Sequence, residues 1–333
     1  MKNIFLIFII LSSALINAQP SFTEMGVKPG SFSRIGFGAR GIGMGNAMIA
    51  VTDGNLVSYY NPAATVFQKD NSFQTAYTVL SLDRSLNFLN FTRKFDFYSS
   101  RDTLSIERKP SSTAGISVGI INSGVGKIDG RDNNGLKTEE LSTSENQFFL
   151  SVANRFSDKL SVGVSAKMYY YKLYEDITST AIGLDIGLLY NLNDEWNFAL
   201  MISDINSRYD WDTAPVYDRD GITTKDQFPL LKKVGFSYLK KEYGLLVGVE
   251  FENSDAKTNI LRFGAEYNIY DQFYLRAGLD QWNLSNQDWP VKPSGGFSYF
   301  KQFDSIIAGI SYTFQIEQYS PSDRHIVGVS VNF

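Results

Sequence analysis

The sequence predicts an all-β protein: a transmembrane antiparallel β-barrel of about 14 strands with a small N-terminal plug. Two observations predict the barrel. From about residue 72 onward, segments of roughly 8–13 residues alternate apolar and polar side chains with a period of two, the pattern of a strand with two unlike faces. Short and long connections also alternate along the chain, as periplasmic turns and external loops do in outer-membrane barrels.

A signal peptide is expected ahead of these segments. Lys2 precedes an apolar run from Ile4 to Leu15, and Ala18 stands at the expected cleavage site. Because the apolar run is short, it does not predict a membrane-spanning helix. The expected division of the chain is signal peptide 1–18, plug 19–70 and barrel 71–333.

Composition excludes several classes of function. Lys and Arg number 31 against 35 Asp and Glu, a net charge of −4 with no basic stripe, so nucleic acid is not an expected partner. The chain has no cysteine and one histidine, which removes the usual ligands of a zinc site; no metal or cofactor is expected. Aromatic residues make up 14% of the chain although its mean hydropathy is −0.16, as expected where apolar and polar residues alternate.

An even number of strands is predicted, as in bacterial outer-membrane barrels. Their expected ranges are 72–80, 86–98, 113–122, 145–156, 159–172, 180–191, 195–204, 230–239, 243–252, 258–269, 272–281, 294–301, 305–316 and 323–333. The range 86–98 is the least regular, because Leu86 and Phe88 are out of phase with Leu89 and Phe91. A β-bulge or a shifted boundary is expected there.

The connections predict which end of the barrel faces outward. Long connections at 123–144, 205–229 and 282–293 are expected on the external side, whereas the long connection 99–112 is an exception on the periplasmic side. Aromatic residues gather beside the short periplasmic turns, as in girdles at the level of the lipid headgroups. They are Tyr190, Trp196, Tyr238, Tyr243, Tyr267, Phe273, Tyr299 and Phe303.

One face of the alternating segments carries charged residues, whereas the opposite face is almost uniformly apolar. The charged residues are Lys167, Asp185, Glu250, Arg262, Glu266, Arg276 and Asp280. In a barrel this face lines the lumen, and in a soluble β-sandwich it would meet solvent. The charges could form a generic polar lumen or a specific latch for the plug, in which Arg40 would pair with a lumen acid such as Glu266.

The last strand favours the barrel. Its alternating residues share one face and stop at an aromatic residue; they are Val327, Val329, Val331 and Phe333. This arrangement resembles the signal that is read by the outer-membrane barrel assembly machinery. That machinery and outer-membrane lipid are therefore expected partners.

A glycine-rich segment lies between the signal peptide and the first strand. Gly36, Gly38 and Gly41 have the spacing of a dinucleotide-binding loop, but no strong strand precedes them and no βαβ unit follows. Asp53 comes too early to contact a ribose. Because a barrel of this size is too wide for side chains alone to fill, the segment suits a plug, and a disordered periplasmic tail is the alternative.

The stretch "FGARGIGMGNAMIAVTDG", followed by "SYYNPAA", resembles the N-terminal signature of the PorV/PorQ family of outer-membrane proteins, which is related to the FadL-type fatty-acid transporters. The matching residues and their neighbours are Gly38, Ala39, Arg40, Gly41, Gly43, Met44, Gly45, Ala47, Asp53, Asn61, Pro62 and Ala63. The resemblance implies that residues 19–70 form a hatch inside the barrel. It also implies that Asn61-Pro62-Ala63 turns the chain toward the first strand.

The resemblance implies a non-enzymatic role in the bacterial outer membrane, with two alternatives left open. Such proteins either move hydrophobic small molecules or assist protein secretion with the type IX apparatus. The expected partner is accordingly a hydrophobic ligand or a type IX secretion component. The long loops of this chain are polar rather than apolar, which argues against an apolar capture groove.

Two features of the sequence suggest sites of other chemistry. Asp218, Asp220 and Gly221 resemble part of a calcium-binding loop, but the first and last ligand positions lack carboxylates, so a solvated loop is the better interpretation. His325 follows Ser322 and Asp323, which raises a phospholipase-like hydrolase as an alternative. No separate nucleophile strand accompanies it, and a purely structural barrel is the remaining alternative.

Overall fold

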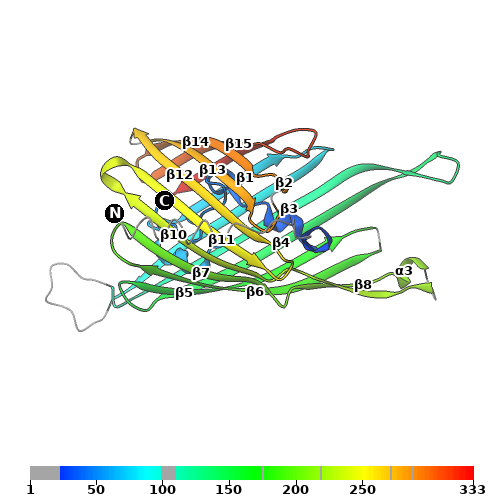
Figure 1. Ribbon diagram of the computed structural model, residues 1–333, viewed down its shortest axis with the longest axis horizontal. Coiled ribbons are helices and arrows are strands. Elements are labelled where there is room, and N and C mark those ends of the chain that lie inside the picture. The colour runs from blue at the N-terminus through cyan, green and yellow to red at the C-terminus, as the bar shows by residue number, and fades with distance from the viewer. Residues whose placement is uncertain (1–22, 99–109, 175, 218–219, 271, 287) are drawn as a thin grey trace.

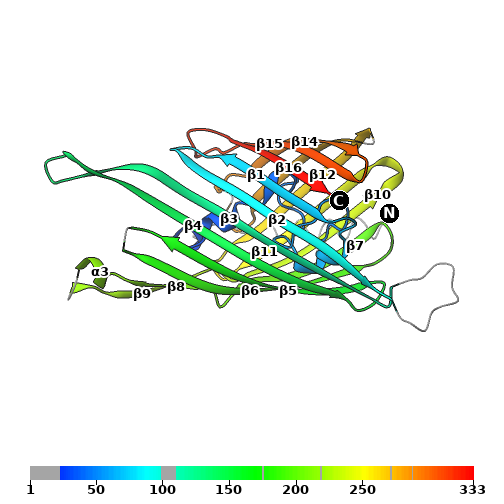
Figure 2. The same cartoon turned by 180° about the vertical axis from the view of Figure 1, so that it is seen from behind.

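The structure, a computed structural model, describes residues 23–98, 110–174, 176–217, 220–270, 272–286 and 288–333. In this part of the chain, 14 antiparallel strands form a closed barrel, and a two-stranded hairpin lies outside the ring (Figures 1 and 2). Each barrel strand pairs with the next one along the chain, except that β7 pairs with β10 across the hairpin β8–β9, and β16 pairs with β1 to close the ring.

The strands of the barrel are β1 (Ser72–Val79), β2 (Arg84–Phe97), β3 (Ser112–Arg131), β4 (Lys137–Arg155), β5 (Leu160–Lys172), β6 (Thr178–Asn191), β7 (Trp196–Ile205), β10 (Leu231–Lys240), β11 (Leu245–Ser254), β12 (Asn259–Tyr270), β13 (Phe273–Asn283), β14 (Lys292–Phe303), β15 (Ile306–Gln315) and β16 (Arg324–Asn332). The hairpin consists of β8 (Arg208–Asp212) and β9 (Thr223–Gln227). These strands confirm the predicted antiparallel β-barrel of about 14 strands.

The helical elements are short: η1 (Met25–Val27), η2 (Ser31–Arg34), α2 (Gly38–Gly43), η3 (Pro62–Phe67), α3 (Ala214–Tyr217) and η5 (Lys241–Tyr243). Within the described residues, no helix has the length and apolar character needed to cross a bilayer.

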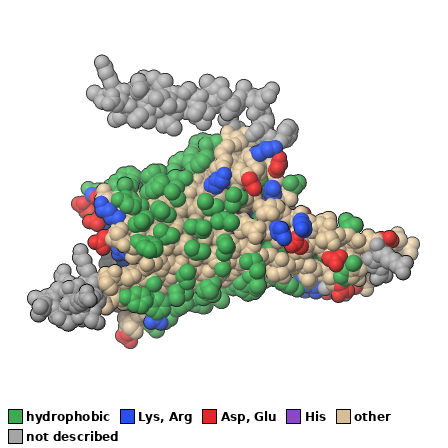
Figure 3. Space-filling model, turned by 90° about the horizontal axis from the view of Figure 1, so that it is seen from below, with side chains coloured by type: hydrophobic (Ala, Val, Ile, Leu, Met, Phe, Trp, Pro, Cys, Tyr) green, Lys and Arg blue, Asp and Glu red, His purple; other side chains and the backbone are tan. Residues whose placement is uncertain are grey.

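The period-two alternation places apolar side chains on the outside of the wall. Figure 3 shows hydrophobic side chains over the wall and charged ones toward its two ends. Exposed apolar residues occur on many of the strands, among them Tyr77, Leu89, Val118, Leu150, Ile182, Ile186, Ile310, Val327 and Val329. A soluble sandwich would not present such a belt, because exposed apolar patches of this extent mark a membrane or partner surface.

The two ends of the barrel differ. We call the end with the short connections 156–159, 192–195, 241–244 and 304–305 the turn end, and the opposite end the loop end. Trp196, Tyr243, Tyr267, Tyr299 and Phe303 of the predicted girdle are exposed near the turn end. The predicted signal peptide and most of the connection 99–112 lie outside the described residues.

The bulge expected in 86–98 is absent from the described strands. β2 pairs with β1 and β3 without a register shift. Leu86 and Phe88 face the lumen and are buried, while Leu89 faces outward. Apolar residues occur on both faces of β2 because its inner face packs against the N-terminal segment. The ring centroid of Phe88 lies 4.9 Å from that of Phe37 in this segment.

Two predicted loops contain strands. Most of the connection 123–144 belongs to β3 and β4, which continue as a ribbon past their neighbouring strands, and 205–229 contains β8, α3 and β9 (Figure 1). The ribbon of β3 and β4 is mostly polar, since it extends beyond the apolar belt, and it lacks the alternation from which the other strands were predicted. β8 does alternate, and its Tyr209 and Trp211 are buried in the apolar core, but the strand has only five residues.

The N-terminal segment, residues 23–71, runs inside the barrel. It begins at the loop end, where the backbone N–H of Glu24 donates to the carbonyl of Ala256 at 3.0 Å. α2 lies against β13–β16 and β1, and η3 lies against β2–β6. The largest apolar core of the molecule forms between this segment and the inner face of the wall, and it includes Phe32, Phe37, Ile42, Met44, Leu86, Phe88, Ile121 and Ile326.

Candidate functional site in the lumen

Glycines on the inner face of the wall let the N-terminal segment approach the strands closely, at several of them backbone to backbone. We call them the glycine row: Gly115, Gly163, Gly187, Gly235, Gly248, Gly264 and Gly278. A Cβ added at Gly264 would lie 2.2 Å from the carbonyl oxygen of Met44, and one at Gly278 would lie 2.1 Å from the amide nitrogen of Gly45. Gly264 is the register partner of both Gly248 and Gly278, so these three lie side by side across the sheet.

Polar side chains of the wall bind backbone carbonyls of the same segment. The Ser161 hydroxyl donates to Ala63 at 3.0 Å, and the Ser237 hydroxyl donates to the carbonyl of Ala50 at 2.7 Å. Asn61 caps η3: its side-chain oxygen accepts from the N–H of Ala63, and its amide donates to the carbonyl of Ile49 at 2.8 Å. These bonds satisfy backbone groups that would otherwise be buried without partners.

The ion pair expected from the sequence between Arg40 and Glu266 is present. The Arg40 guanidinium binds the Glu266 carboxylate through two bonds, Nη2 to Oε1 at 2.8 Å and Nε to Oε2 at 3.0 Å. Arg276 on β13 donates to the same carboxylate and to the Ser298 hydroxyl. Arg40 also donates to the carbonyl of Asp53 at 2.8 Å, so one side chain ties two parts of the N-terminal segment to β12.

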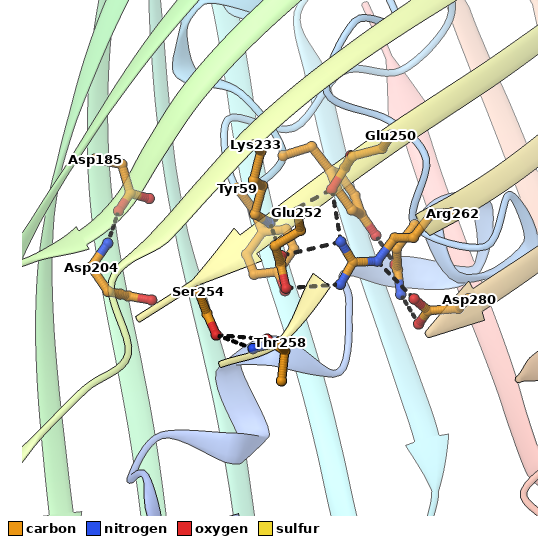
Figure 4. A network of polar contacts seen from close by, with 12 residues as sticks. Tyr59, Asp185, Asp204, Lys233, Glu250, Glu252, Ser254, Thr258, Arg262 and Asp280 are labelled. Atoms are coloured by element: carbon orange, nitrogen blue, oxygen red, sulfur yellow. Dashed lines mark hydrogen bonds and ion pairs between the residues drawn. The ribbon is translucent and has the colours of Figure 1, made fainter. Parts of the chain in front are cut away.

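A second charged cluster is centred on Arg262 (Figure 4). Its guanidinium contacts Glu250 at 3.0 Å, Glu252 at 3.1 Å and Asp280 at 2.7 Å. Lys233 on β10 adds a contact to Glu252 at 3.2 Å. Two cations and three carboxylates thus meet on four neighbouring strands, which leaves one negative charge in excess.

The third cluster is centred on Lys167. Its ammonium group lies 2.8 Å from Asp185 and 2.7 Å from Asp204, and the Tyr169 hydroxyl also donates to Asp204. This cluster and the Arg262 cluster line one small polar cavity together with residues of the N-terminal segment.

β-Bulges aim two of these carboxylates into the lumen. The register between β12 and β13 shifts beside Asp280, where Gln281 has a φ of 59°, and the register between β6 and β7 shifts beside Asp204, whose own φ is 61°. Asp280 thereby reaches Arg262 and also accepts a hydrogen bond of 2.8 Å from the side-chain amide of Asn46. The bulges thus position groups that bind the N-terminal segment.

All the charged residues predicted to line the lumen are buried, each 7% exposed or less, and each takes part in an ion pair. Sequence reasoning missed other polar residues of the same clusters, among them Asn46, Asp204, Lys233 and Glu252. Glu252 could have been found, because it lies two residues after Glu250 on the same strand face. Lys233 and Asp204 lie near the ends of their strands, where the alternation does not show which residues face the lumen.

The family-motif residues lie along the N-terminal segment as follows: Gly38, Ala39, Arg40, Gly41 and Gly43 in α2, Met44, Gly45 and Ala47 against the glycine row, Asp53 beside Arg40, and Asn61, Pro62 and Ala63 at the start of η3. Of the C-terminal signal, Val327, Val329 and Phe333 are exposed on the outside of the wall, and Val331 is half-buried.

The two alternative chemical sites have no catalytic or metal-binding geometry in the described residues. His325 accepts or donates a hydrogen bond of 2.7 Å with the Tyr312 hydroxyl on the exposed face. Ser322 bonds to Ser81, and Asp323 accepts from the backbone of Glu317, so neither contacts the imidazole. Among the described residues no group of three potential metal ligands occurs, and Asp218 lies outside them.

The solved structures with a similar fold include two toluene transporters. The toluene transporter TodX of Pseudomonas putida superposes with a TM-score of 0.57 at 13% identity, covering 89% of this chain and 96% of TodX. The chain has the fold of the FadL-type barrels. The toluene transporter TbuX of Ralstonia pickettii gives 0.53 at 13% identity, with coverages of 89% and 97%, and a Pseudomonas aeruginosa FadL homologue gives 0.52 at 11%, with 90% and 98%.

These structures are outer-membrane transport barrels rather than enzymes, and at such identities the likeness is one of fold. No family model matches the chain, and no curated protein matches it.

Proposed function

We propose that this protein is a non-enzymatic outer-membrane barrel that admits small, largely apolar molecules, and that its N-terminal segment is the plug of the lumen. The observation that carries the proposal is the way this segment is held: close contact with the glycine row and the ion pair between Arg40 and Glu266 hold it across the lumen. A fourteen-strand ring needs such a filling to stay closed to polar solutes. The neighbouring transporters and the motif resembling PorV/PorQ proteins support the same role.

Replacing Arg40 with alanine is expected to loosen the plug. The variant loses both bonds to Glu266 and the bond to the carbonyl of Asp53, and hydrogen bonds to charged groups contribute about 1.5–3 kcal/mol each. We expect liposomes that contain the variant to be about tenfold or more permeable to small sugars than liposomes that contain the wild type. Lys69→Ala is the control, because Lys69 pairs with Asp53 at the exposed surface of the same segment. Equal leakage of Arg40→Ala and wild type would contradict the plug.

Transport itself is tested by uptake of labelled toluene into intact cells that make the protein, compared with cells that do not. Faster uptake with no increase in sugar permeability is the expected result. No difference in uptake would leave a purely structural barrel as the better interpretation.

Assistance to type IX secretion is the second candidate. The observation that favours it is the ribbon formed by residues 126–143, where β3 and β4 have left their neighbouring strands and expose both edges. Unpaired strand edges are places where another chain can add a strand. Purification from the native membrane in mild detergent tests it. A stoichiometric large membrane partner that is lost when residues 128–141 are replaced by a short turn would support secretion.

A further inference from the structure

A cavity of about 490 Å³ opens at the loop end of the barrel, above the N-terminal segment. Its walls come from the connections β1–β2, β13–β14 and β15–β16, and Ile35 of the N-terminal segment contributes to it from below. Its size falls within the range of about 300–1,000 Å³ that small-molecule sites occupy. The lumen clusters described above take no part in its lining, with the exception of Gln281 beside Asp280.

Hydrogen bonds tie the three connections to one another, so the cavity is built before any ligand enters. The Ser81 hydroxyl bonds to the hydroxyls of Ser320 at 2.6 Å and Ser322 at 2.8 Å, which joins β1–β2 to β15–β16. The Tyr319 hydroxyl donates to the carbonyl of Asp288 at 3.3 Å, which joins β15–β16 to β13–β14. A preformed site avoids the entropic cost of ordering loops on binding.

The charged groups of the cavity leave one positive charge in excess. Lys292 and Arg324 share the carboxylate of Glu317, at 3.0 and 2.9 Å. Arg84 shares the inner face of β2 with Leu86, and no carboxylate of the described residues lies within ion-pair distance of it. Its Nε donates to the carbonyl of Ser81, which orients the guanidinium, and its terminal nitrogens stay available. Asp288 is the other acid of the lining.

Three of the five apolar residues in the lining carry rings. Trp289, Pro290 and Tyr319 line the cavity, and Leu80 and Ile35 complete its apolar surface. The Trp289 indole nitrogen donates to the side-chain oxygen of Gln281 at 3.3 Å, which restrains the ring. Planar rings favour a ligand that can stack on them.

From this combination we propose that the cavity binds a small organic monoanion with a flat apolar face, of the aromatic carboxylate class, with its carboxylate on Arg84 and its ring against Trp289. The proposal deepens the proposed function, on which it rests, by naming the substrate class. A neutral hydrocarbon would leave the Arg84 guanidinium unused, and a cation would be repelled by the excess positive charge. A guanidinium matches a carboxylate in two parallel hydrogen bonds.

The experiment is calorimetric titration of the detergent-purified protein with benzoate, toluene and galacturonate. We expect benzoate to bind, and toluene and galacturonate to bind at least about tenfold more weakly, since each lacks the charge or the flat apolar face. Arg84→Gln and Trp289→Ala should each weaken benzoate binding by about tenfold or more. Arg93→Gln, which removes an outward-facing arginine from the same strand, is the matched control and should bind benzoate as the wild type does.

Heat-modifiable gel mobility shows whether each variant is a folded barrel, and both substituted side chains lie at the mouth rather than in the core. The proposal is overturned if benzoate fails to bind the folded wild type, if toluene binds equally well, or if Arg84→Gln binds like Arg93→Gln. Binding without faster cellular uptake of benzoate would reject the transport function and keep the site. Uptake of toluene without benzoate binding would reject the site and keep transport.

Discussion

Gly264→Val is expected to push the N-terminal segment off the barrel wall and to open the lumen. The added Cβ would lie 2.2 Å from the carbonyl oxygen of Met44 and 2.9 Å from its carbonyl carbon, and neither atom can rotate away because both belong to the backbone. Overpacking of a well-packed core costs about 1–3 kcal/mol. We therefore expect a lower free energy of unfolding and a rise in the permeability of liposomes to small sugars by about tenfold or more.

Gly295→Val is the matched control for this substitution. Gly295 lies on β14, two strands away from β12, and the nearest atom to an added Cβ is the carbonyl oxygen of Arg276 at 3.8 Å, an ordinary contact. The alternation of β14 places Gly295 on the outer face of the wall, where valine adds apolar surface. A closed lumen in folded Gly264→Val would mean that the segment is not held by its contact with the glycine row.

The wall of the barrel could be predicted from the sequence because its pattern is local. Alternation alone identifies the strands, and it places Lys167, Glu250 and Arg262 on the inner face without knowledge of their partners. The motif around Arg40 predicts a segment inside the lumen through the resemblance, and the width of the barrel favours the same position. The pair with Glu266 followed as a hypothesis, since a buried guanidinium in a plug needs a carboxylate from the wall.

What could not be predicted depends on contacts between distant parts of the chain. The apolar inner face of β2 is explained by Phe37, which no local pattern connects to Phe88. The loop-end cavity joins Arg84 to residues more than two hundred positions away, such as Lys292. The bulges that aim Asp204 and Asp280 insert one residue into a regular strand, and they shift the phase on which the alternation depends.

Arg262→Gln is expected to have the largest effect on stability. The substitution leaves Glu250, Glu252 and Asp280 with Lys233 as the remaining cation, so the cluster changes from one excess negative charge to two. Removing one partner from a buried ion pair costs about 3–5 kcal/mol, because the other charge stays buried without compensation. We expect a loss of that size in urea unfolding of the barrel in detergent, followed by tryptophan fluorescence.

A second substitution that restores the net charge of the cluster shows whether charge causes this loss of stability. In Arg262→Gln combined with Glu252→Gln, one cation and two carboxylates remain, which is the net charge of the original cluster. The double variant should therefore be more stable than Arg262→Gln alone, although it has fewer native contacts. Lys232→Gln, which removes an exposed charge beside Lys233, should unfold like the wild type. If the double variant were less stable than the single one, the packing of the Arg262 side chain rather than its charge would hold these four strands together.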